Sequence, residues 1–435
     1  MPIALENVQV GIIGMGDMGR MYARRLSAAG FTINACDREE KFHSLEEQFS
    51  ENPKINIFRN GHYVSRLSDY IIYSVEAENI DKIVAAYGPS TKVGGIVGGQ
   101  TSCKAPEIRA FEKHLPEDVE IVSCHSLHGP NVDTRGQPLV LIQHRASDES
   151  LEFVRSILSC FNSQIVYLTA AEHDKITADT QAATHAAFMS MGLAWHANQQ
   201  FPWEVPRYVG GIENVKINIS LRIFSNKWHV YAGLAILNPA AHAQIMQYAK
   251  SVTELFKLMI EGEQQQFRDR IYAAKKAVFG GLPDSHELLL SDYLLDQFSL
   301  SNVPPEERTP NSHLSLLAMV DCWWKLGIVP YDHMICSTPL FRIWLGVTEY
   351  LFQKPGLLED CMKVALENNT FRSDDLEFTV AARSWSEIIG FGNFHLYKDK
   401  FERTQEFFSP RFADATKLGN EMIKTIFEHT KQGKK

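Results

Sequence analysis

The chain has 435 residues, of which 45% are hydrophobic and 22% charged, and its formal net charge is −9. These values are typical of a globular protein with two or three domains. The acidic balance, with no basic block beyond a KQGKK tail, argues against nucleic acid as the main partner. Seven scattered cysteines without a CxxC pair indicate a reducing compartment. We find no signal peptide or membrane span in the sequence and expect a cytoplasmic protein without a membrane partner.

The stretch from Val8 to Arg38 has the order strand, glycine turn, helix, strand, acid. An apolar run over 8–13 leads into GMGDMG, a helical pattern covers about 18–29, and a second apolar run covers 31–36. In a dinucleotide-binding unit, Gly14 permits the tight turn, Gly16 the approach of the pyrophosphate and Gly19 the close packing of the helix. The helix N-terminus then faces the phosphates. A glycine-rich turn in another α/β fold is the structural alternative.

The residues after the second strand bear on the choice of cofactor. Asp37 could bind the ribose hydroxyls of NAD, whereas Arg38 could clamp the 2′-phosphate of NADP with two hydrogen bonds. The sequence therefore favours NADP over NAD, although Arg38 could also be a solvated surface charge. Cofactor contacts are expected from the turn and the adjacent strand ends, at Gly14, Met15, Gly16, Asp17, Met18, Gly19, Asp37, Arg38 and Ser74.

Further apolar runs alternate with helical patterns as far as about residue 170. Strands are expected at 55–58, 70–75, 95–97 and 119–124, with helices at 79–87 and 105–114 between them. This alternation predicts a Rossmann-type, doubly wound parallel α/β sheet, which the runs 139–143 and 164–168 could extend. Ligands bind such sheets beyond the carboxyl ends of the strands.

From about Ala171 onward, long helical patterns dominate and an all-α region is expected. The stretch 177–195 is apolar around most of its circumference, which predicts a buried helix. Polar, proline-containing residues at 281–311 are typical of a connection. We therefore expect a dinucleotide-binding domain at 1–170 and helical domains at 171–300 and 301–435.

The second helical domain is expected to repeat the first. THAAFMSM at 184–191 is similar to SHLSLLAM at 312–319, and SLRIFSNKW at 220–228 is similar to STPLFRIWL at 337–345. Two copies could bury against each other the face that one copy would bury in a homodimer. The chain is thus expected to be a homodimer or a monomer with pseudo-dimeric helical repeats. Coincidence between helix pairs of similar composition is the alternative.

The segment EIVSCHSLHGP places His125 and His128 directly after a strand expected to end at Cys124. An imidazole, with an ordinary pKa of about 6.5, can be neutral at pH 7 and accept a proton from a substrate hydroxyl. His125 is the candidate base and His128 a candidate substrate contact. Either could instead cap loop backbone. No third ligand stands at a suitable spacing, so no metal site is predicted.

The segment GGQTSCKAPEI follows the preceding strand and opens a helix. Ser102 could donate a hydrogen bond to the substrate as a second catalytic residue, or it could cap this helix. Lys104 could meet a carboxylate or remain solvated.

Polar residues in the helical region are candidates for substrate binding. His185 lies inside the apolar helix, where most histidines are core residues. Arg222, Lys227 and His229 form a cationic cluster that an acidic substrate would need, with a solvated face as the alternative.

The Rossmann unit, SCK at 102–104, HSLHGP at 125–130, EHDK at 172–175 and TQAATHAAF at 180–188 together resemble prephenate dehydrogenase of the fungal, NADP-dependent type, over nearly the whole chain. The resemblance implies oxidative decarboxylation of prephenate to 4-hydroxyphenylpyruvate, a precursor of tyrosine, with hydride transfer to NADP. It implies that His125 accepts the proton of the ring 4-hydroxyl and that Ser102 orients this hydroxyl and the nicotinamide. It also implies that His185 contacts the substrate.

The chain departs from the family pattern at one position. Many members carry an Arg about six residues before an Asp-Pro step, which anchors a substrate carboxylate, but Gly233 and Glu349 stand at the matching positions here. We expect Arg222 or Lys227 to take this role, with Arg342 as a further candidate.

Three other functions remain open from the sequence. Arogenate dehydrogenase shares the fold and acts on a substrate with an amino group in place of the keto group. A 6-phosphogluconate-type dehydrogenase usually needs a catalytic Lys on the first long helix, but here Lys175 lies near its start and His185 in its middle. A non-catalytic NADP sensor would keep the glycine turn without the SCK and HSLHGP stretches.

Overall fold

The computed structural model describes residues 7–283, 286–336 and 338–432. The expectations for the start of the chain, for part of the 281–311 connection, for Ser337 and for the end of the basic tail lie outside these ranges. The chain divides into two compact units, with the boundary between Thr177 and Ala178. We call them the sheet unit and the helical unit. Within the described ranges, no helix is both long enough and apolar enough to cross a membrane.

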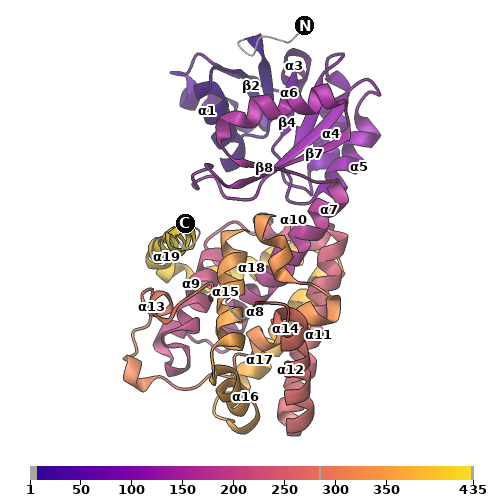
Figure 1. Ribbon diagram of the computed structural model, residues 1–435. Helices are drawn as coiled ribbons and strands as arrows, with labels where there is room; N and C mark the ends of the chain where they lie inside the picture. The colour runs from indigo at the N-terminus through magenta and orange to yellow at the C-terminus, as the bar shows by residue number, and fades with distance from the viewer. Residues whose placement is uncertain (1–6, 284–285, 337, 433–435) are drawn as a thin grey trace. The chain divides into compact units, whose positions relative to one another are not determined.

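The described part of the sheet unit contains an eight-stranded sheet in the order β3-β2-β1-β4-β5-β6-β7-β8 (Figure 1). The strands are β1 (Gln9–Ile13), β2 (Thr32–Cys36), β3 (Ile55–Ile57), β4 (Tyr70–Tyr73), β5 (Ile96–Gly99), β6 (Glu120–Ser126), β7 (Pro138–Arg145) and β8 (Gln164–Tyr167). The first six run parallel, as predicted. β7 pairs antiparallel with β6, and β8 follows it in parallel. No crossover helix lies between β6 and β7, so the chain returns antiparallel through a loop.

Helices cover both faces of this sheet. They are α1 (Asp17–Ala28), α2 (Phe42–Phe49), α3 (Gly61–Leu67), α4 (Ile80–Tyr87), α5 (Lys104–His114), α6 (Asp148–Leu158) and α7 (Ala170–Thr177). Neighbouring residues of one strand enter opposite cores, as the period of two requires. Ile72 packs in the core that contains Tyr22 of α1, whereas Ile71 packs in the core that contains Phe111 of α5. The doubly wound sheet is thereby confirmed.

The described part of the helical unit contains helices and no strand. It begins with a π-helical turn, η5 (Ala178–Ala182). The α-helices that follow are α8 (Ala183–Ala197), α9 (Ile212–Phe224), α10 (His229–Leu237), α11 (Pro239–Glu261), α12 (Gln264–Phe279), α13 (Asp292–Asp296), α14 (Leu314–Leu326), α15 (Pro339–Gln353), α16 (Leu357–Glu367), α17 (Arg372–Gly390), α18 (Phe394–Phe408) and α19 (Phe412–Gln432).

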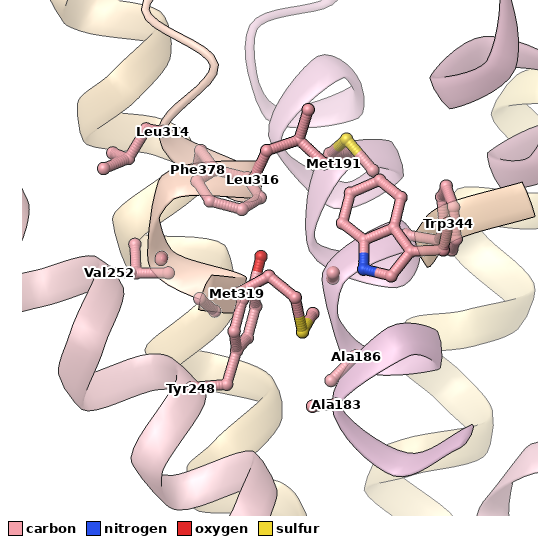
Figure 2. Packing of buried hydrophobic residues seen from close by; sticks show 14 of the residues in the cluster. Ala183, Ala186, Met191, Tyr248, Val252, Leu314, Leu316, Met319, Trp344 and Phe378 are labelled. Carbon is pink, nitrogen blue, oxygen red and sulfur yellow. The ribbon is translucent and has the colours of Figure 1, made fainter. Parts of the chain in front are cut away.

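One apolar core joins these helices. Figure 2 shows Tyr248 of α11, Met319 of α14 and Trp344 of α15 in this core together with side chains of α8 and α17. The ring of Trp344 lies edge-on to Phe188 of α8, with the ring centres 4.6 Å apart. The buried helix predicted around 177–195 is thus found, and its α-helical turns are interrupted by η5.

The predicted duplication concerns helices of this one unit. Most of the first pair of similar stretches lies in α8 and α14, and the second pair falls largely in α9 and α15. Between α12 and α14 the described residues hold the short α13 and a 3-10 turn at Pro305–Glu307. The division into three domains and the repeat itself stay predictions.

Candidate active site

The glycine turn after β1 leaves open space at its middle glycine. Gly14 has φ of +102°, and a Cβ there would lie 2.3 Å from the carbonyl oxygen of Ser74. A Cβ on Gly19 would lie 2.0 Å from the carbonyl oxygen of Gly14, so the close packing of α1 requires this glycine. A Cβ on Gly16 would meet nothing within 4 Å. The protein's own packing therefore does not require Gly16, whereas a pyrophosphate approaching the backbone would.

The N-terminus of α1 is open to an anion. Its N-cap residue, Gly16, provides no side-chain cap, so the first N–H groups of the helix point toward the turn. At the neighbouring strand ends, the Ser74 hydroxyl donates to Oε1 of Gln100 over 3.2 Å. Nε2 of Gln100 is buried and has no partner among the described residues. These features fit a bound dinucleotide.

The acid after β2 is already held by the protein. Oδ2 of Asp37 accepts from the Met15 N–H at 2.9 Å and from Nζ of Lys41 at 3.1 Å, and Oδ1 accepts from the Arg38 N–H at 2.7 Å. The Arg38 side chain is 74% exposed. Lys41 is a second cation that the sequence analysis did not select, although its spacing of four residues from Asp37 indicates the pair.

Lys104 ties together the carboxyl ends of β5 and β6. Its side chain is completely buried, and Nζ donates to the carbonyl oxygens of Gly99 and Cys124, each at 2.9 Å. It also pairs with Oε1 of Glu107 at 2.9 Å. A solvated Lys104 is therefore wrong, and the carboxylate that it meets belongs to its own helix.

Glu107 extends this network to both catalytic segments. Oε2 accepts from the N–H and the hydroxyl of Thr101, at 3.0 and 2.6 Å, and Oε1 accepts from the Ser123 hydroxyl at 2.7 Å. Thr101 precedes Ser102, and Ser123 lies two residues before His125 in β6. The buried pair thus fixes the backbone that carries both predicted catalytic residues.

Ser102 does not cap α5. The N-cap residue is Cys103, and the carboxylate of Asp174 in α7 caps the helix by accepting from the N–H groups of Lys104 and Ala105 at 2.6 and 2.8 Å. The capping interpretation of Ser102 is wrong because this remote carboxylate already satisfies the helix end. Within the described ranges the half-buried Ser102 hydroxyl makes no hydrogen bond, which suits a group that binds substrate.

His125 lies within β6, which ends at Ser126, two residues later than predicted. Its Nδ1 is 2.7 Å from Nε2 of His173, and Nδ1 of His173 is 2.9 Å from Oδ1 of Asp174. Burial holds the pKa of His125 well below its usual range, and the neighbouring His173, Lys104 and His128 lower this pKa further. The imidazole is therefore neutral at pH 7, as a base requires.

His128 lies in the loop after β6. Its Nδ1–H donates to the carbonyl oxygen of Gly129 over 2.9 Å. Its Nε2 is buried and makes no hydrogen bond within the described ranges. Burial also lowers the pKa of His128. The neutral ring can accept one hydrogen bond from a ligand.

In the helical unit, two of the predicted substrate contacts share a neighbour, Tyr231. The buried His185 ring lies edge-on to Tyr231, with the ring centres 4.9 Å apart, and burial lowers the pKa of His185 to about 4. Burial raises the pKa of Tyr231 to about 12, and the charge of Arg222 in the last turn of α9 partly opposes that rise. Arg222 also donates to Asn420, and Lys227 lies in the exposed turn between α9 and α10. No sequence pattern indicated Tyr231, because it is one of many aromatic residues in apolar helices.

Comparison with known proteins identifies relatives over both units. A family model described as a 6-phosphogluconate dehydrogenase C-terminal domain matches residues 182–428, and one described as NADP oxidoreductase coenzyme F420-dependent matches residues 9–97. The chain is 62% identical to a probable prephenate dehydrogenase, NADP(+), of Schizosaccharomyces pombe, over 98% of this chain and 99% of that protein.

A second fungal relative agrees with the first. The prephenate dehydrogenase, NADP(+), of Saccharomyces cerevisiae is 58% identical, over 97% of this chain and 94% of that protein. A crystal structure of prephenate dehydrogenase from A. aeolicus shares 16% identity at a TM-score of 0.49, over 63% of this chain and 98% of that one. On the two full-length fungal relatives, the chain belongs to the NADP-dependent prephenate dehydrogenase family.

Proposed function

We propose that this chain converts prephenate to 4-hydroxyphenylpyruvate and CO2 with reduction of NADP, and that His125 is its general base. The observation that carries the assignment of the base is a neutral imidazole at the carboxyl end of β6, held beside the Ser102 turn by Lys104. The glycine turn belongs to the same sheet, whose carboxyl edge is where such folds bind dinucleotides.

The chemistry asks little of the protein beyond orientation and one base. NADP, when bound, takes up the hydride that leaves C4 of prephenate. His125 accepts the proton of the 4-hydroxyl as the hydride leaves. Loss of CO2 from C1 then makes the ring aromatic and leaves a phenolate oxygen, to which His125 can return the proton. The driving force is aromatisation, so no acid is required at C1, and a positioned base contributes roughly 10²–10⁴-fold.

Arg38 and Lys41 account for the use of NADP. Both cations follow the strand that ends at the ribose position, and Lys41 compensates the charge of Asp37. An exposed guanidinium at Arg38 can take a phosphate in two hydrogen bonds. We therefore assign the 2′-phosphate contact to Arg38, with Lys41 as a second cation.

The two carboxylates of prephenate call for cations and polar contacts from the helical unit. We assign this role to Arg222 or Lys227, with His185 as a further substrate contact and His128 as one from the sheet unit. Arg222→Ala and Lys227→Ala are measured separately. A raised KM for prephenate with unchanged NADP affinity supports the assignment, and an unchanged KM in both variants refutes it.

Three broader parts of this proposal rest on the sequence. They are a cytoplasmic location, the absence of a nucleic-acid partner, and a homodimer or a monomer with pseudo-dimeric helical repeats. Sedimentation equilibrium tests the last of these, because a tight dimer with an extensive helical interface would contradict the idea that the repeat replaces dimerisation.

The activity is tested by mixing the protein with NADP and prephenate. We expect equal amounts of NADPH, CO2 and 4-hydroxyphenylpyruvate. Arogenate in a parallel reaction is the control for the side-chain keto group. NADPH formation from arogenate but not from prephenate would overturn the substrate assignment, and no NADPH from either would overturn the activity.

A further inference from the structure

A chain of three side chains lies behind the proposed base. The carboxylate of Asp174 is 2.9 Å from Nδ1 of His173, and Nε2 of His173 is 2.7 Å from Nδ1 of His125. His173 is 1% exposed and Asp174 is 6% exposed, so this chain of contacts is shielded from water. All three residues belong to the sheet unit.

The hydrogen-bonding capacity of these groups fixes the positions of the protons. An ionised carboxylate only accepts, so Nδ1 of His173 must donate to Asp174. A neutral His173 then presents an unprotonated Nε2, which can only accept a hydrogen bond. The contact with His125 therefore requires a proton on Nδ1 of His125, and Nε2 of His125 carries the free lone pair.

The remaining charges around the chain agree with this arrangement. Burial lowers the pKa of His173, and only Asp174 and Glu107 act against that shift. The carboxyl pKa of Asp174 is below its usual value because it accepts from His173 and from the N–H groups that open α5. Lys104 faces both histidines and is paired with Glu107. Two neutral imidazoles behind one ionised carboxylate follow.

We infer that His173 is a positioning residue, which Asp174 orients and which sets the tautomer of His125 so that Nε2 accepts the substrate proton. The inference rests on the proposed role of His125 as base. When His125 takes up the proton, its Nδ1–H bond to His173 becomes charge-assisted, and such bonds are stronger than neutral ones. No proton has to leave His173 or Asp174 for this to occur.

The chain also links the two catalytic segments. The Asp174 carboxylate that orients His173 caps α5 directly after the Ser102 turn. One side chain therefore positions both the base and the segment that carries Ser102. EHDK, which contains His173 and Asp174, was part of the family resemblance without an assigned role, and the structure gives it one.

The test compares two replacements of His173. His173→Leu removes the acceptor, so Nδ1 of His125 loses its partner, and we expect kcat to fall by about 10², within the range of a lost base. His173→Gln places an amide oxygen where it can accept from Nδ1 of His125, and we expect it to recover at least about tenfold of that loss. In the Leu variant the acidic limb of the kcat profile should also move to lower pH, because the protonated base has lost its acceptor.

Each outcome separates this inference from the proposed function. A Leu variant within about threefold of wild type, or Gln and Leu variants that are equally slow, would overturn the positioning role. His125→Asn serves as the reference: if it is as fast as wild type, the base assignment itself is wrong. If it is slow while His173→Leu is fast, only the role of His173 fails. NADP affinity and circular dichroism check that each variant is folded.

A measurement on the unaltered protein needs no variant to fold. NMR of ¹⁵N-histidine-labelled protein at pH 7 should show His125 with a protonated Nδ1 and an unprotonated Nε2. A proton on Nε2 of His125 in place of Nδ1 would refute the inference.

Discussion

Replacing Glu107 by Gln should destabilise the sheet unit strongly. Glu107 and Lys104 are both 0% exposed, and the carboxylate is the charge that compensates the buried ammonium group. Breaking a buried pair at one partner costs about 3–5 kcal/mol. Since whole domains unfold with only about 5–15 kcal/mol, this loss is a large share of the total.

The variant should also disturb the active site. Glu107 accepts from Thr101 on one side and from Ser123 on the other, so the amide can no longer accept all of these bonds. We expect a lower midpoint of unfolding together with a reduced kcat, because the Ser102 turn and the strand carrying His125 lose their common anchor.

Two spectroscopic signals separate the two units. All seven tryptophans follow the boundary, beginning with Trp195, so tryptophan fluorescence reports the helical unit. Far-ultraviolet circular dichroism reports both units. In urea, Glu107→Gln should shift the circular dichroism transition and leave the fluorescence transition near its wild-type position.

Two controls test the physical reasoning. Glu152→Gln removes the partner of an exposed pair with Arg155 and should leave the transition unchanged. Adding Lys104→Met to Glu107→Gln removes the unpaired ammonium and should recover part of the lost stability. If Glu107→Gln is as stable as wild type, or if the double variant is no better than the single one, the argument from the buried charge is refuted.

Three further predictions follow from the cofactor turn and the helical core. Gly16→Ala should weaken NADP binding without lowering thermal stability, whereas Gly19→Ala should lower the melting temperature, because only its Cβ would strike backbone; a stable Gly19→Ala variant would contradict this. Arg38→Ala and Lys41→Ala should each weaken NADP by about tenfold or more and leave NAD nearly unchanged, as measured by titration; equal losses for both cofactors would refute the phosphate contact. The pKa of His185 falls from its ordinary value to about 4 on folding, so the folded state binds fewer protons and loses stability as pH falls from about 6.5 to 4. This loss amounts to about 3 kcal/mol, and His185→Phe should flatten it in fluorescence-monitored unfolding; an unchanged slope would show that His185 is not its source.

The parts of the site that the sequence predicted are local in the chain. The glycine turn and its flanking strands are contiguous, and the roles of Gly14 and Gly19 follow from spacing alone. His125 could be selected because it follows an apolar strand at the ligand-binding edge. Only the position of the strand end was wrong, because pairing with β7 extends β6 to Ser126.

The parts that the sequence did not predict depend on distant partners. His173 lies 48 residues from His125, and Asp174 lies 70 residues from the N–H that it caps at Lys104. No local pattern reveals such pairs, so Ser102 remained a candidate cap. The burial of Lys104 was equally hidden, since a lysine next to a helix start is ordinarily solvated.

The most direct test of the central claim is a single turnover of NADP-saturated protein with prephenate, followed by NADPH absorbance, for wild type and His125→Asn. We predict prompt NADPH formation by the wild type and a rate lower by about 10² or more in the variant, with NADP affinity retained. A variant that forms NADPH as fast as wild type would contradict the assignment of His125 as the base for prephenate oxidation.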